Sequence, residues 1–294
     1  MPPDISGIFT VISMKPLSAS PPNPITSPDV EAVWRQYDHD EQRLTAPLSQ
    51  RMLDLAQLAP GMQVLDLASG RGEPAIPAAH RVGAGGSVLG LDLDQRMLQM
   101  ARERASREGL TNLELRVADI EQAAGVAPAH FHAVLARWVL MYLSAPVAAL
   151  QQARRAMRPG ALLVAAVWAE PQRVAYYSLP RQVLAHHSAV PAPDMTRPGT
   201  FYYADAATLQ RDFNAAGLQI THIEEQNVEV METASAAGLI TWTRAFGMTR
   251  LLQHLAPQVQ QAWETDMAIQ AEKLRRDGLI RLGGITRIVV ATAV

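Results

Sequence analysis

Two glycines follow a short apolar run that carries a single acid, in the stretch VLDLASGRGEPA at 64–75. The spacing Gly70-x-Gly72-x-x-Ala75 fits the turn that binds a dinucleotide pyrophosphate at a helix N-terminus. Asp92 follows at the distance expected of a ribose-binding acid. The pattern therefore indicates a nucleotide site at the end of a strand, with NAD as one candidate ligand.

Two carboxylates next to the glycines argue against a diphosphate. Asp66 precedes the turn and Glu73 follows it. Like charges close to a pyrophosphate repel it strongly where water is partly excluded. S-adenosylmethionine (SAM) carries a ribose, an adenine, an ammonium group and a sulfonium but no phosphate, so the two acids favour SAM over NAD.

Further adenosine ligands are expected at successive strand ends. Asp92, followed by Leu93, ends the second predicted strand, where its two oxygens can accept from both ribose hydroxyls. Met97 on the next helix is a candidate to cover an adenine face, with core packing as the alternative. Asp119 and Ile120 follow the third strand and are candidates for the adenine amine and ring edge. Such convergence is typical of the carboxyl edge of an open α/β sheet.

These residues need a frame of alternating strands and helices. Apolar, strand-like runs occur at 62–69, 87–94, 113–119, 132–142 and 160–168, and helical patterns at 29–58, 73–83, 95–109 and 146–157. The alternation predicts an α/β fold, in which a parallel sheet is covered by helices on both faces. Right-handed crossovers make this a doubly wound, Rossmann-like layer.

The pattern changes after residue 170. A helix at 205–217, a strand at 218–230, a mostly helical stretch and a strand at 285–294 after two glycines complete the chain. We expect a SAM-binding core over 29–170, completed by 205–231 and 281–294. The inserted segments 171–204 and 232–280 are expected to form a lid above the carboxyl edge of the sheet.

The first residues read as a separate segment. Residues 1–28 contain many prolines and are expected to form a disordered tail. Met14 is a candidate for the biological start, in which case the residues before it do not belong to the native protein.

Five stretches occur in the order found in one known family: VLDLASGRG, SVLGLDLDQRML, LRVADIE, FHAVLARWVLMYL and RRAMRPGALL. Over residues 30–170, together with the closing strand, the chain resembles the class I SAM-dependent methyltransferases. It is most similar to the branch that contains the ubiquinone and menaquinone C-methyltransferases. The resemblance implies a seven-stranded sheet with an antiparallel last strand.

The same resemblance implies roles for individual residues. The residues implied near the methionine part of SAM are Asp66, Gly70 and Gly72. Arg137 lies in the stretch that borders this end in the family, and Tyr37 is placed to close over it. Ala68 stands where the family usually has its first glycine. We expect its methyl group to adjust the turn without abolishing SAM binding.

Aromatic side chains gather in the predicted lid, although only 5% of the chain is aromatic. Those assigned to an acceptor pocket are Trp168, Tyr176, Tyr177, Tyr202, Trp242 and Phe246, with a core for the lid itself as the alternative. No catalytic signature is present, and none is needed, because the sulfonium activates the methyl group and the protein has to align and dehydrate the reactants. If a general base acts, the candidates are His39, His186, His187 or a tyrosine of the lid.

The amino-acid composition argues against several other classes of function and site. The net charge of −2 gives no electrostatic reason to expect a nucleic acid partner, and the absence of Cys excludes disulfides, zinc thiolates and a Cys nucleophile. No apolar run reaches the roughly 18 residues of a membrane span. No third ligand accompanies His186 and His187 at a useful spacing, so no metal is expected.

The sequence therefore predicts an enzyme that moves a methyl group in line from SAM to a small apolar or aromatic metabolite, at oxygen or carbon. A cytoplasmic location is expected, and a homodimer is the expectation from base rates alone. The alternatives are an NAD-dependent oxidoreductase and a protein that binds SAM without catalysis.

Overall fold

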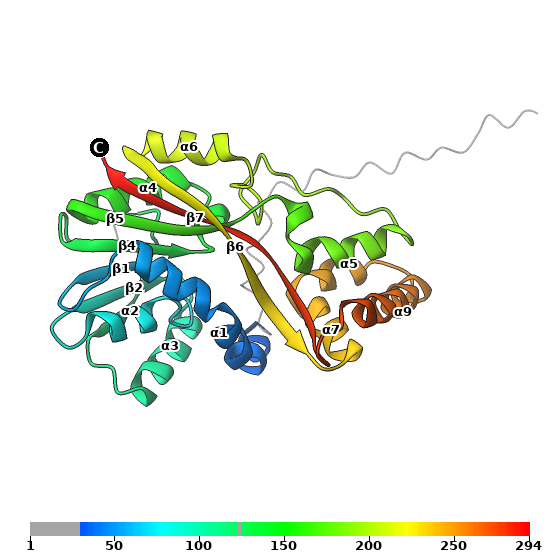
Figure 1. Cartoon of the computed structure of the whole chain (residues 1–294). Helices are drawn as coiled ribbons and strands as arrows, with labels where there is room; N and C mark the ends of the chain where they lie inside the picture. The colour runs from blue at the N-terminus through cyan, green and yellow to red at the C-terminus, as the bar shows by residue number, and fades with distance from the viewer. Residues whose placement is uncertain (1–29, 123–124) are drawn as a thin grey trace, which may run out of the picture.

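The computed structural model describes residues 30–122 and 125–294. The predicted tail at 1–28 and the candidate start at Met14 lie outside these residues. Figure 1 shows an α/β lobe that contains the carboxyl terminus and a smaller helical lobe beside it. Two long strands, β6 (Leu218–Thr233) and β7 (Ile280–Ala293), run from one lobe into the other.

The α/β lobe is built on one seven-stranded sheet with the order β3-β2-β1-β4-β5-β7-β6. Its remaining strands are β1 (Gln63–Leu67), β2 (Ser87–Asp92), β3 (Leu113–Val117), β4 (Phe131–Arg137) and β5 (Met157–Trp168). These five pair in parallel, whereas β7 is antiparallel to both β5 and β6. The doubly wound sheet and its antiparallel last strand are therefore confirmed.

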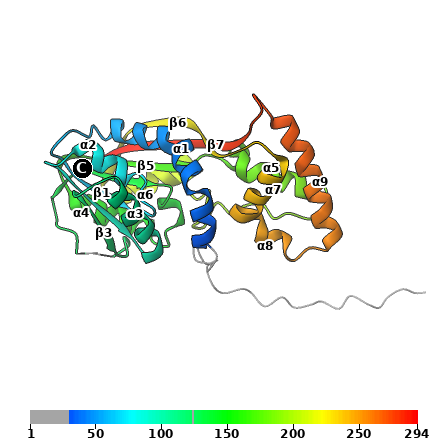
Figure 2. The same cartoon turned by 90° about the horizontal axis from the view of Figure 1, so that it is seen from below.

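Helices cover both faces of the sheet, as its near-continuous apolar strands require. One face carries α1 (Val30–Leu55), α2 (Ala75–Val82) and α3 (Gln95–Arg107), and the other carries α4 (Pro146–Ala156) and α6 (Ala206–Ala215). The pattern at 29–58 thus forms a single helix, which spans the sheet and continues to the side of the helical lobe (Figure 2).

The helical lobe follows from the two segments predicted as a lid. It contains α5 (Ala175–Ala185), α7 (Ala236–Thr243), α8 (Thr249–Leu252) and α9 (Pro257–Leu274), joined by the π-helical turn η4 (Arg244–Met248). Only the first part of 171–204 lies in this lobe. Its end returns to the α/β lobe, where the Gly199 N–H donates to the Met141 carbonyl at 2.7 Å.

Gly283 and Gly284 lie inside β7, where the sequence analysis placed a boundary before the strand. A Cβ on Gly283 would lie 2.0 Å from the carbonyl oxygen of Val228 on β6. A Cβ on Gly284 would lie 2.8 Å from Cα of Val174, just before α5. The glycines therefore mark a close approach of three backbone segments, not a strand end, and the predicted boundary was wrong.

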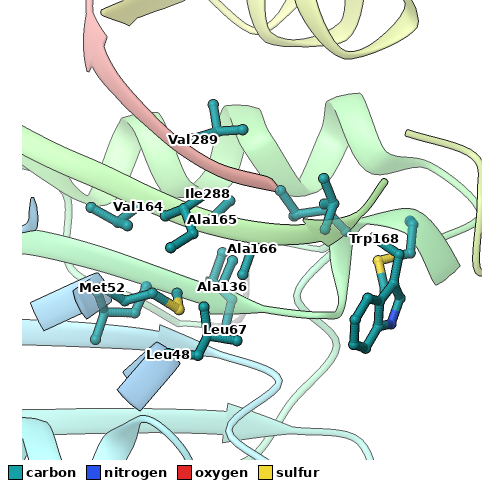
Figure 3. Close-up of a cluster of buried hydrophobic side chains, with 14 of the residues drawn as sticks. Leu48, Met52, Leu67, Ala136, Val164, Ala165, Ala166, Trp168, Ile288 and Val289 are labelled. Carbon is teal, nitrogen blue, oxygen red and sulfur yellow. The ribbon is translucent and has the colours of Figure 1, made fainter. Parts of the chain in front are cut away.

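The main core lies between α1, the centre of the sheet and the helices on its far face (Figure 3). Leu48 and Met52 of α1 are fully buried against it. Small side chains on the central strands, such as Ala136 and Ala165, allow the helices to approach closely. Trp168, at the end of β5, closes this core on the side of the helical lobe.

Candidate cofactor and acceptor site

The glycine turn between β1 and α2 is built from residues with left-handed backbone conformations. Ala68, Gly70 and Gly72 have φ values of 54°, 51° and 95°. A Cβ on Gly72 would lie 2.5 Å from Cδ1 of Ile76, so only glycine fits there. Ala68 adopts a left-handed conformation that side chains with a Cβ disfavour, so glycine would be less strained at this position.

Asp92 joins the turn to the end of β2. Its Oδ2 accepts from the Gly70 N–H at 2.8 Å, and its Oδ1 accepts from the Asp94 N–H at 2.8 Å. Burial raises the pKa of Asp92 above its usual value, although these N–H groups oppose the shift. A carboxylate oxygen has two lone pairs, so each oxygen can accept a further hydrogen bond from a ligand hydroxyl.

Asp66 is a buried carboxyl group inside β1. Its exposure is 0%, and neither oxygen forms a well-aligned hydrogen bond with the described residues, although the backbone N–H of Ala75 is close enough to lower the pKa of Asp66 slightly. Burial raises the pKa of Asp66 well above its usual value; the charge of Arg137 opposes this, whereas those of Glu73 and Asp92 add to it. A buried acid without a well-aligned hydrogen bond is costly, and the site therefore fits a cationic ligand group such as an ammonium.

Glu73 is not a free carboxylate beside the glycine turn, because both of its oxygens accept hydrogen bonds. The Ser49 hydroxyl donates to its Oε2 at 2.8 Å, and Nη1 of Arg104 donates to its Oε1 at 2.8 Å. Arg104 therefore offsets part of the charge of Glu73, which the sequence analysis treated as free. The remaining charge of Glu73 still acts on Asp66, whose pKa it helps to raise.

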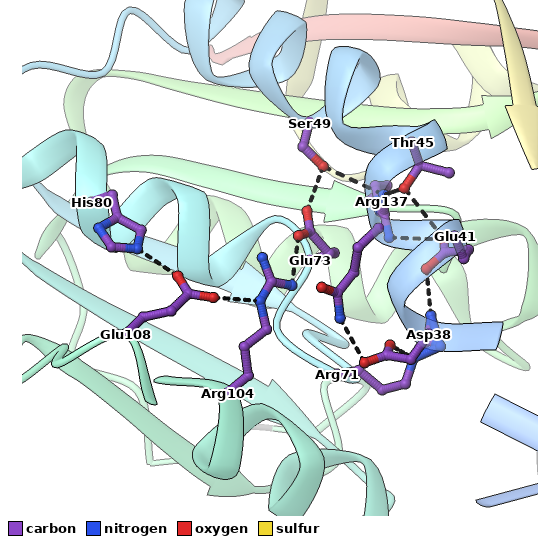
Figure 4. A network of polar contacts seen from close by, with 11 residues as sticks. Asp38, Glu41, Thr45, Ser49, Arg71, Glu73, His80, Arg104, Glu108 and Arg137 are labelled. Atoms are coloured by element: carbon purple, nitrogen blue, oxygen red, sulfur yellow. Dashed lines mark hydrogen bonds and ion pairs between the residues drawn. The ribbon is translucent and has the colours of Figure 1, made fainter. Parts of the chain in front are cut away.

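A polar network ties α1 to the glycine turn and to β4 (Figure 4). Nη1 of Arg137 donates to the Thr45 hydroxyl at 2.8 Å, and its Nη2 lies 3.4 Å from Oε1 of Glu41. Nη2 of Arg71 donates to Oε2 of the same Glu41 at 2.6 Å. Burial alone would raise the pKa of Glu41, but Arg71 and Arg137 hold it below its usual value. Arg137 therefore contacts α1 as well as bordering the turn.

The candidates for adenine contacts differ in exposure. Leu93 is 66% exposed directly after Asp92, whereas Met97 is 3% exposed on the inner face of α3. Asp119 accepts from the Glu121 N–H at 2.9 Å, and Ile120 is 5% exposed in the main core. Leu93 thus presents an open apolar surface beside the acid, whereas Met97 and Ile120 are buried.

Seven aromatic side chains form a continuous series, here called the aromatic wall. Its members are Trp138, Trp168, Tyr176, Trp242, Phe246, Tyr37 and Trp34. The Trp138 and Trp168 rings stack at 4.5 Å, and Trp168 lies 5.1 Å from Tyr176. Trp242 continues the series to Phe246 at 4.8 Å. The wall begins at the ends of β4 and β5, crosses the helical lobe and ends on α1.

Trp138 is held in an unusual backbone conformation at the start of the aromatic wall. Its φ of 54° lies in the left-handed region, which bulky residues rarely occupy. Its backbone N–H donates to the Ala166 carbonyl at 2.9 Å, and its Nε1–H donates to the Thr286 hydroxyl at 3.1 Å. Neighbouring strands thus fix the ring at the carboxyl edge of the sheet, where strain of this kind is typical of functional sites.

Two of the predicted acceptor-pocket residues lie elsewhere. The Tyr177 ring contacts Phe201 at 4.5 Å between centroids, and Arg181 lies over its other side. The Tyr202 hydroxyl donates to Asp212 of α6 at 3.1 Å, in the α/β lobe. The structure therefore brings Trp168, Tyr176, Trp242 and Phe246 together and separates Tyr177 and Tyr202 from them.

The three candidate histidines do not gather at the aromatic wall. The His39 side chain is 92% exposed on α1. His186 and His187 follow the last turn of α5, and Nε2 of His187 lies 2.8 Å from Oδ2 of Asp266 on α9. At a rise of about 1.5 Å per residue, they lie roughly 15 Å along the helix axis from Tyr176.

Sequence reasoning missed several residues at this site. Trp34 and Arg71 are among them, and Cζ of Arg71 lies 3.7 Å from the centre of the Trp34 ring. Trp34 stands three residues before Tyr37, a helical spacing that could have placed both on one face. Trp138 directly follows Arg137, a position that could have suggested it. No local signal relates Arg71 to α1.

A cavity of about 310 Å³ lies between α1, β6 and α7. Its lining includes Tyr37 and Trp242 of the aromatic wall, together with Met231 and Glu232 of β6. This volume is at the lower end of the range for small-molecule pockets.

Within 30–122 and 125–294, no helix has the length and apolar character needed to cross a membrane. The same residues contain no group of three or more His, Cys, Asp or Glu side chains that could hold a metal ion.

Comparisons with known proteins agree with this geometry. A family model described as a methyltransferase domain matches residues 58–238, which is more than half of the chain. The chain is 34% identical over 114 residues to aklanonic acid methyltransferase DauC from Streptomyces sp. (strain C5), covering 39% of this chain and 51% of that one. It is 25% identical over 168 residues to the ubiquinone/menaquinone biosynthesis C-methyltransferase UbiE from Shewanella baltica, covering 57% and 60%.

A solved structure shows the same fold. Geranyl diphosphate methyltransferase in complex with SAM aligns with a TM-score of 0.51 and 15% identity over 92% of each chain.

The aligned segments span only about half to three fifths of the two curated relatives. The predicted similarity to the ubiquinone and menaquinone branch is confirmed. The chain therefore belongs to the family of SAM-dependent methyltransferases, with a methyltransferase domain at 58–238.

Proposed function

We propose that the protein transfers a methyl group from SAM to an oxygen of a small, apolar, ring-bearing acceptor. The observation that carries this proposal is the aromatic wall. Its first members, Trp138 and Trp168, stand at the carboxyl edge of the sheet, and Tyr176 and Trp242 extend it into the helical lobe. Flat aromatic surfaces favour offset or edge contacts with a ring in the acceptor.

Residues at the strand ends suit the parts of the cofactor. The free lone pairs of Asp92 suit the ribose hydroxyls, and the exposed Leu93 suits an adenine face. Asp119 and Ile120 border the adenine side. The buried carboxyl group of Asp66 suits the ammonium group. When bound, SAM supplies a methyl group that its sulfonium has already activated.

This arrangement assigns a different ligand to each lobe. The α/β lobe holds the cofactor, and the helical lobe from 171–185 and 236–274 covers the acceptor. Apolar side chains of the aromatic wall exclude water and align the acceptor with the methyl group, which is the main contribution of a protein to such a transfer.

Tyr176 and Tyr37 are the two members of the aromatic wall that carry a hydroxyl group. Among the described residues the hydroxyl of Tyr176 has no hydrogen-bond partner, and burial raises its pKa well above the usual value. Burial also raises the pKa of Tyr37. Both hydroxyls therefore stay protonated at neutral pH, so they can donate a hydrogen bond but do not act as bases.

Because the hydroxyl of Tyr176 stays protonated and does not act as a base, the proposal favours acceptors that need no base. An acceptor oxygen that is already ionised at neutral pH, in a carboxylate or an acidic phenol, needs no base and is attracted by the sulfonium. Methyl transfer to carbon would require a group that removes a proton from the product. The relative DauC is named for an acid, in line with this choice.

The test uses matched acceptors with SAM and measures S-adenosylhomocysteine release and the position of the new methyl group by mass spectrometry. An aromatic carboxylic acid and an acidic phenol are compared with a neutral ring that offers only carbon. We expect O-methylation, with a rate that rises as the acceptor ionises. Methyl transfer to carbon at an equal rate would contradict the proposal. Binding of SAM without turnover of any acceptor, including a metabolite extract, would favour a non-catalytic protein.

A further inference from the structure

Arg71 lies between Gly70 and Gly72 of the glycine turn, with its guanidinium group turned toward α1. The side chain is 9% exposed, and its Cζ lies 3.7 Å from the centre of the Trp34 ring. Nη2 donates to Glu41 at 2.6 Å, and Nε lies 3.2 Å from Oδ1 of Asp38. One edge of the guanidinium is thus occupied by two carboxylates of α1 (Figure 4).

The other edge of Arg71 has no partner. Nη1 is buried and forms no hydrogen bond with any described residue. Oδ1 of Asp38 is also buried; it is ion-paired with Nε of Arg71 at 3.2 Å but forms no hydrogen bond, and Oδ2 of Asp38 accepts from Gln42 at 2.6 Å. A buried N–H of a charged group without an acceptor is costly, so Nη1 of Arg71 is expected to have a ligand, and Oδ1 of Asp38 keeps a lone pair for the same ligand.

We propose that Arg71 and Asp38 recognise the amino-acid end of SAM. Nη1 of Arg71 donates to the α-carboxylate, and Oδ1 of Asp38 accepts from the α-ammonium, next to the acid Asp66. The inference rests on SAM being the cofactor of the proposed function, but not on the identity of the acceptor.

Charge and chemistry both support this assignment. The cations Arg71 and Arg137 balance the anions Asp38 and Glu41, which together form one connected cluster. A zwitterion with no net charge can join this cluster without changing the balance between these four charges. The guanidinium group is planar, and its N–H groups match a carboxylate better than a lysine ammonium does. Stacking on Trp34 fixes the plane of the group.

A purely structural role for Arg71 is the competing explanation, because the side chain also connects α1 to the turn. Two ligands separate the explanations. S-adenosylhomocysteine carries the amino-acid end, and 5′-methylthioadenosine has the same adenosine and sulfur without it. A residue that recognises the amino-acid end affects only the first ligand, whereas a residue that shapes the whole site affects both.

The experiment measures both affinities by calorimetry for the wild-type protein, Arg71→Gln, Arg71→Lys and Asp38→Asn. Arg104→Gln is the matched control, since Arg104 is also a partly buried, ion-paired residue of the network. Thermal unfolding checks that each variant is folded, and Arg71→Lys retains the positive charge if Arg71→Gln is unstable.

We expect Arg71→Gln to weaken S-adenosylhomocysteine binding about 10- to 100-fold, the effect of losing one charge-assisted hydrogen bond. Arg71→Lys and Asp38→Asn should weaken it less, and 5′-methylthioadenosine binding should change less than about twofold. Equal losses for both ligands, or no loss for either, would overturn the inference. If the wild-type protein binds neither ligand, the proposed cofactor fails, and this assignment fails with it.

Discussion

The Gly70 N–H donates to Oδ2 of Asp92 at 2.8 Å, so the glycine turn and the acid at the end of β2 form one unit. The other oxygen of Asp92 holds the loop before α3 through the Asp94 N–H. Asp92 therefore shapes both loops that border the expected ribose position, in addition to offering its own lone pairs.

Replacing Asp92 with Ala should weaken S-adenosylhomocysteine binding by ~1–3 kcal/mol, because ribose hydrogen bonds and the brace on Gly70 are lost together. Asp94→Ala is the control. Asp94 caps α3 by accepting from the Arg96 N–H at 2.9 Å, so its loss should lower stability by ~1 kcal/mol without changing affinity. Calorimetry and urea unfolding measure the two quantities. Unchanged affinity in Asp92→Ala would remove this acid from the site.

Replacing Ala68 with Gly should raise the free energy of unfolding by about 0.5–1 kcal/mol. The gain comes from relief of the left-handed conformation, reduced by the larger entropy of the unfolded glycine chain. Cofactor affinity should remain within about twofold, since Gly70 and Gly72 already permit close approach of the backbone. Urea unfolding and calorimetry test both statements, and a large gain in affinity would show that the Ala68 methyl obstructs the cofactor.

Asp66→Asn should stabilise the ligand-free protein at pH 7–8. Burial raises the pKa of Asp66 above its ordinary 3.8, so its protonated form favours folding, and this contribution is lost as the pH rises through the folded-state value. Asn is neutral throughout, so the variant should lack this decline. Thermal unfolding between pH 4 and pH 8 gives the comparison. An identical pH dependence in both proteins would contradict the assigned titration.

The same substitution should have the opposite effect on binding. If the ionised Asp66 holds the cofactor ammonium, the affinity of the wild-type protein for S-adenosylhomocysteine increases with pH through the titration of this acid. Asp66→Asn should bind more weakly and without that increase. Calorimetry in buffers with different ionisation enthalpies would detect the proton that the wild-type protein releases on binding. No proton release in the wild-type protein would exclude this role.

Tyr176→Phe should lower kcat/KM for the acceptor about tenfold, because one hydrogen bond to the acceptor oxygen is lost. Binding of S-adenosylhomocysteine should not change. Tyr177→Phe is a matched control on the same helix, where the ring contacts Phe201 and Arg181 and lies away from the aromatic wall. Steady-state kinetics at saturating SAM measure the difference. Equal effects of the two substitutions would argue against a contact between Tyr176 and the acceptor.

Most of the sheet could be predicted because burial on both faces forces apolar runs of strand length. The prediction failed at the ends of β6 and β7, which extend into the helical lobe and contain paired charges such as Glu232 with Arg281. Gly283 and Gly284 were interpreted as a boundary because glycine commonly marks turns. In the structure, glycine is needed at both positions because the backbone approaches β6 and Val174 closely, and these segments are distant in the chain.

The residues of the glycine turn and the strand ends were more predictable than their contacts with distant segments. Gly70, Gly72 and Asp92 follow from a local turn and from the ends of neighbouring strands. In contrast, the partner of Glu73 is Arg104, and the stacking partner of Arg71 is Trp34, and neither pairing has a local signal. The histidines were selected because they lie in segments expected to cover the site, and no spacing related them to the aromatic wall.

The pairing of Thr233 with Ile280 closes the ribbon of β6 and β7 at its far end. In topological terms, everything from 234 to 279 is the loop of one β-hairpin, and it contains α7, α8 and α9. The entropy of closing such a loop changes slowly with its length. This hairpin loop can therefore be lengthened, shortened or exchanged while the glycine turn and Asp92 remain untouched. Under the proposed function, such an exchange would change the acceptor and leave the cofactor site intact.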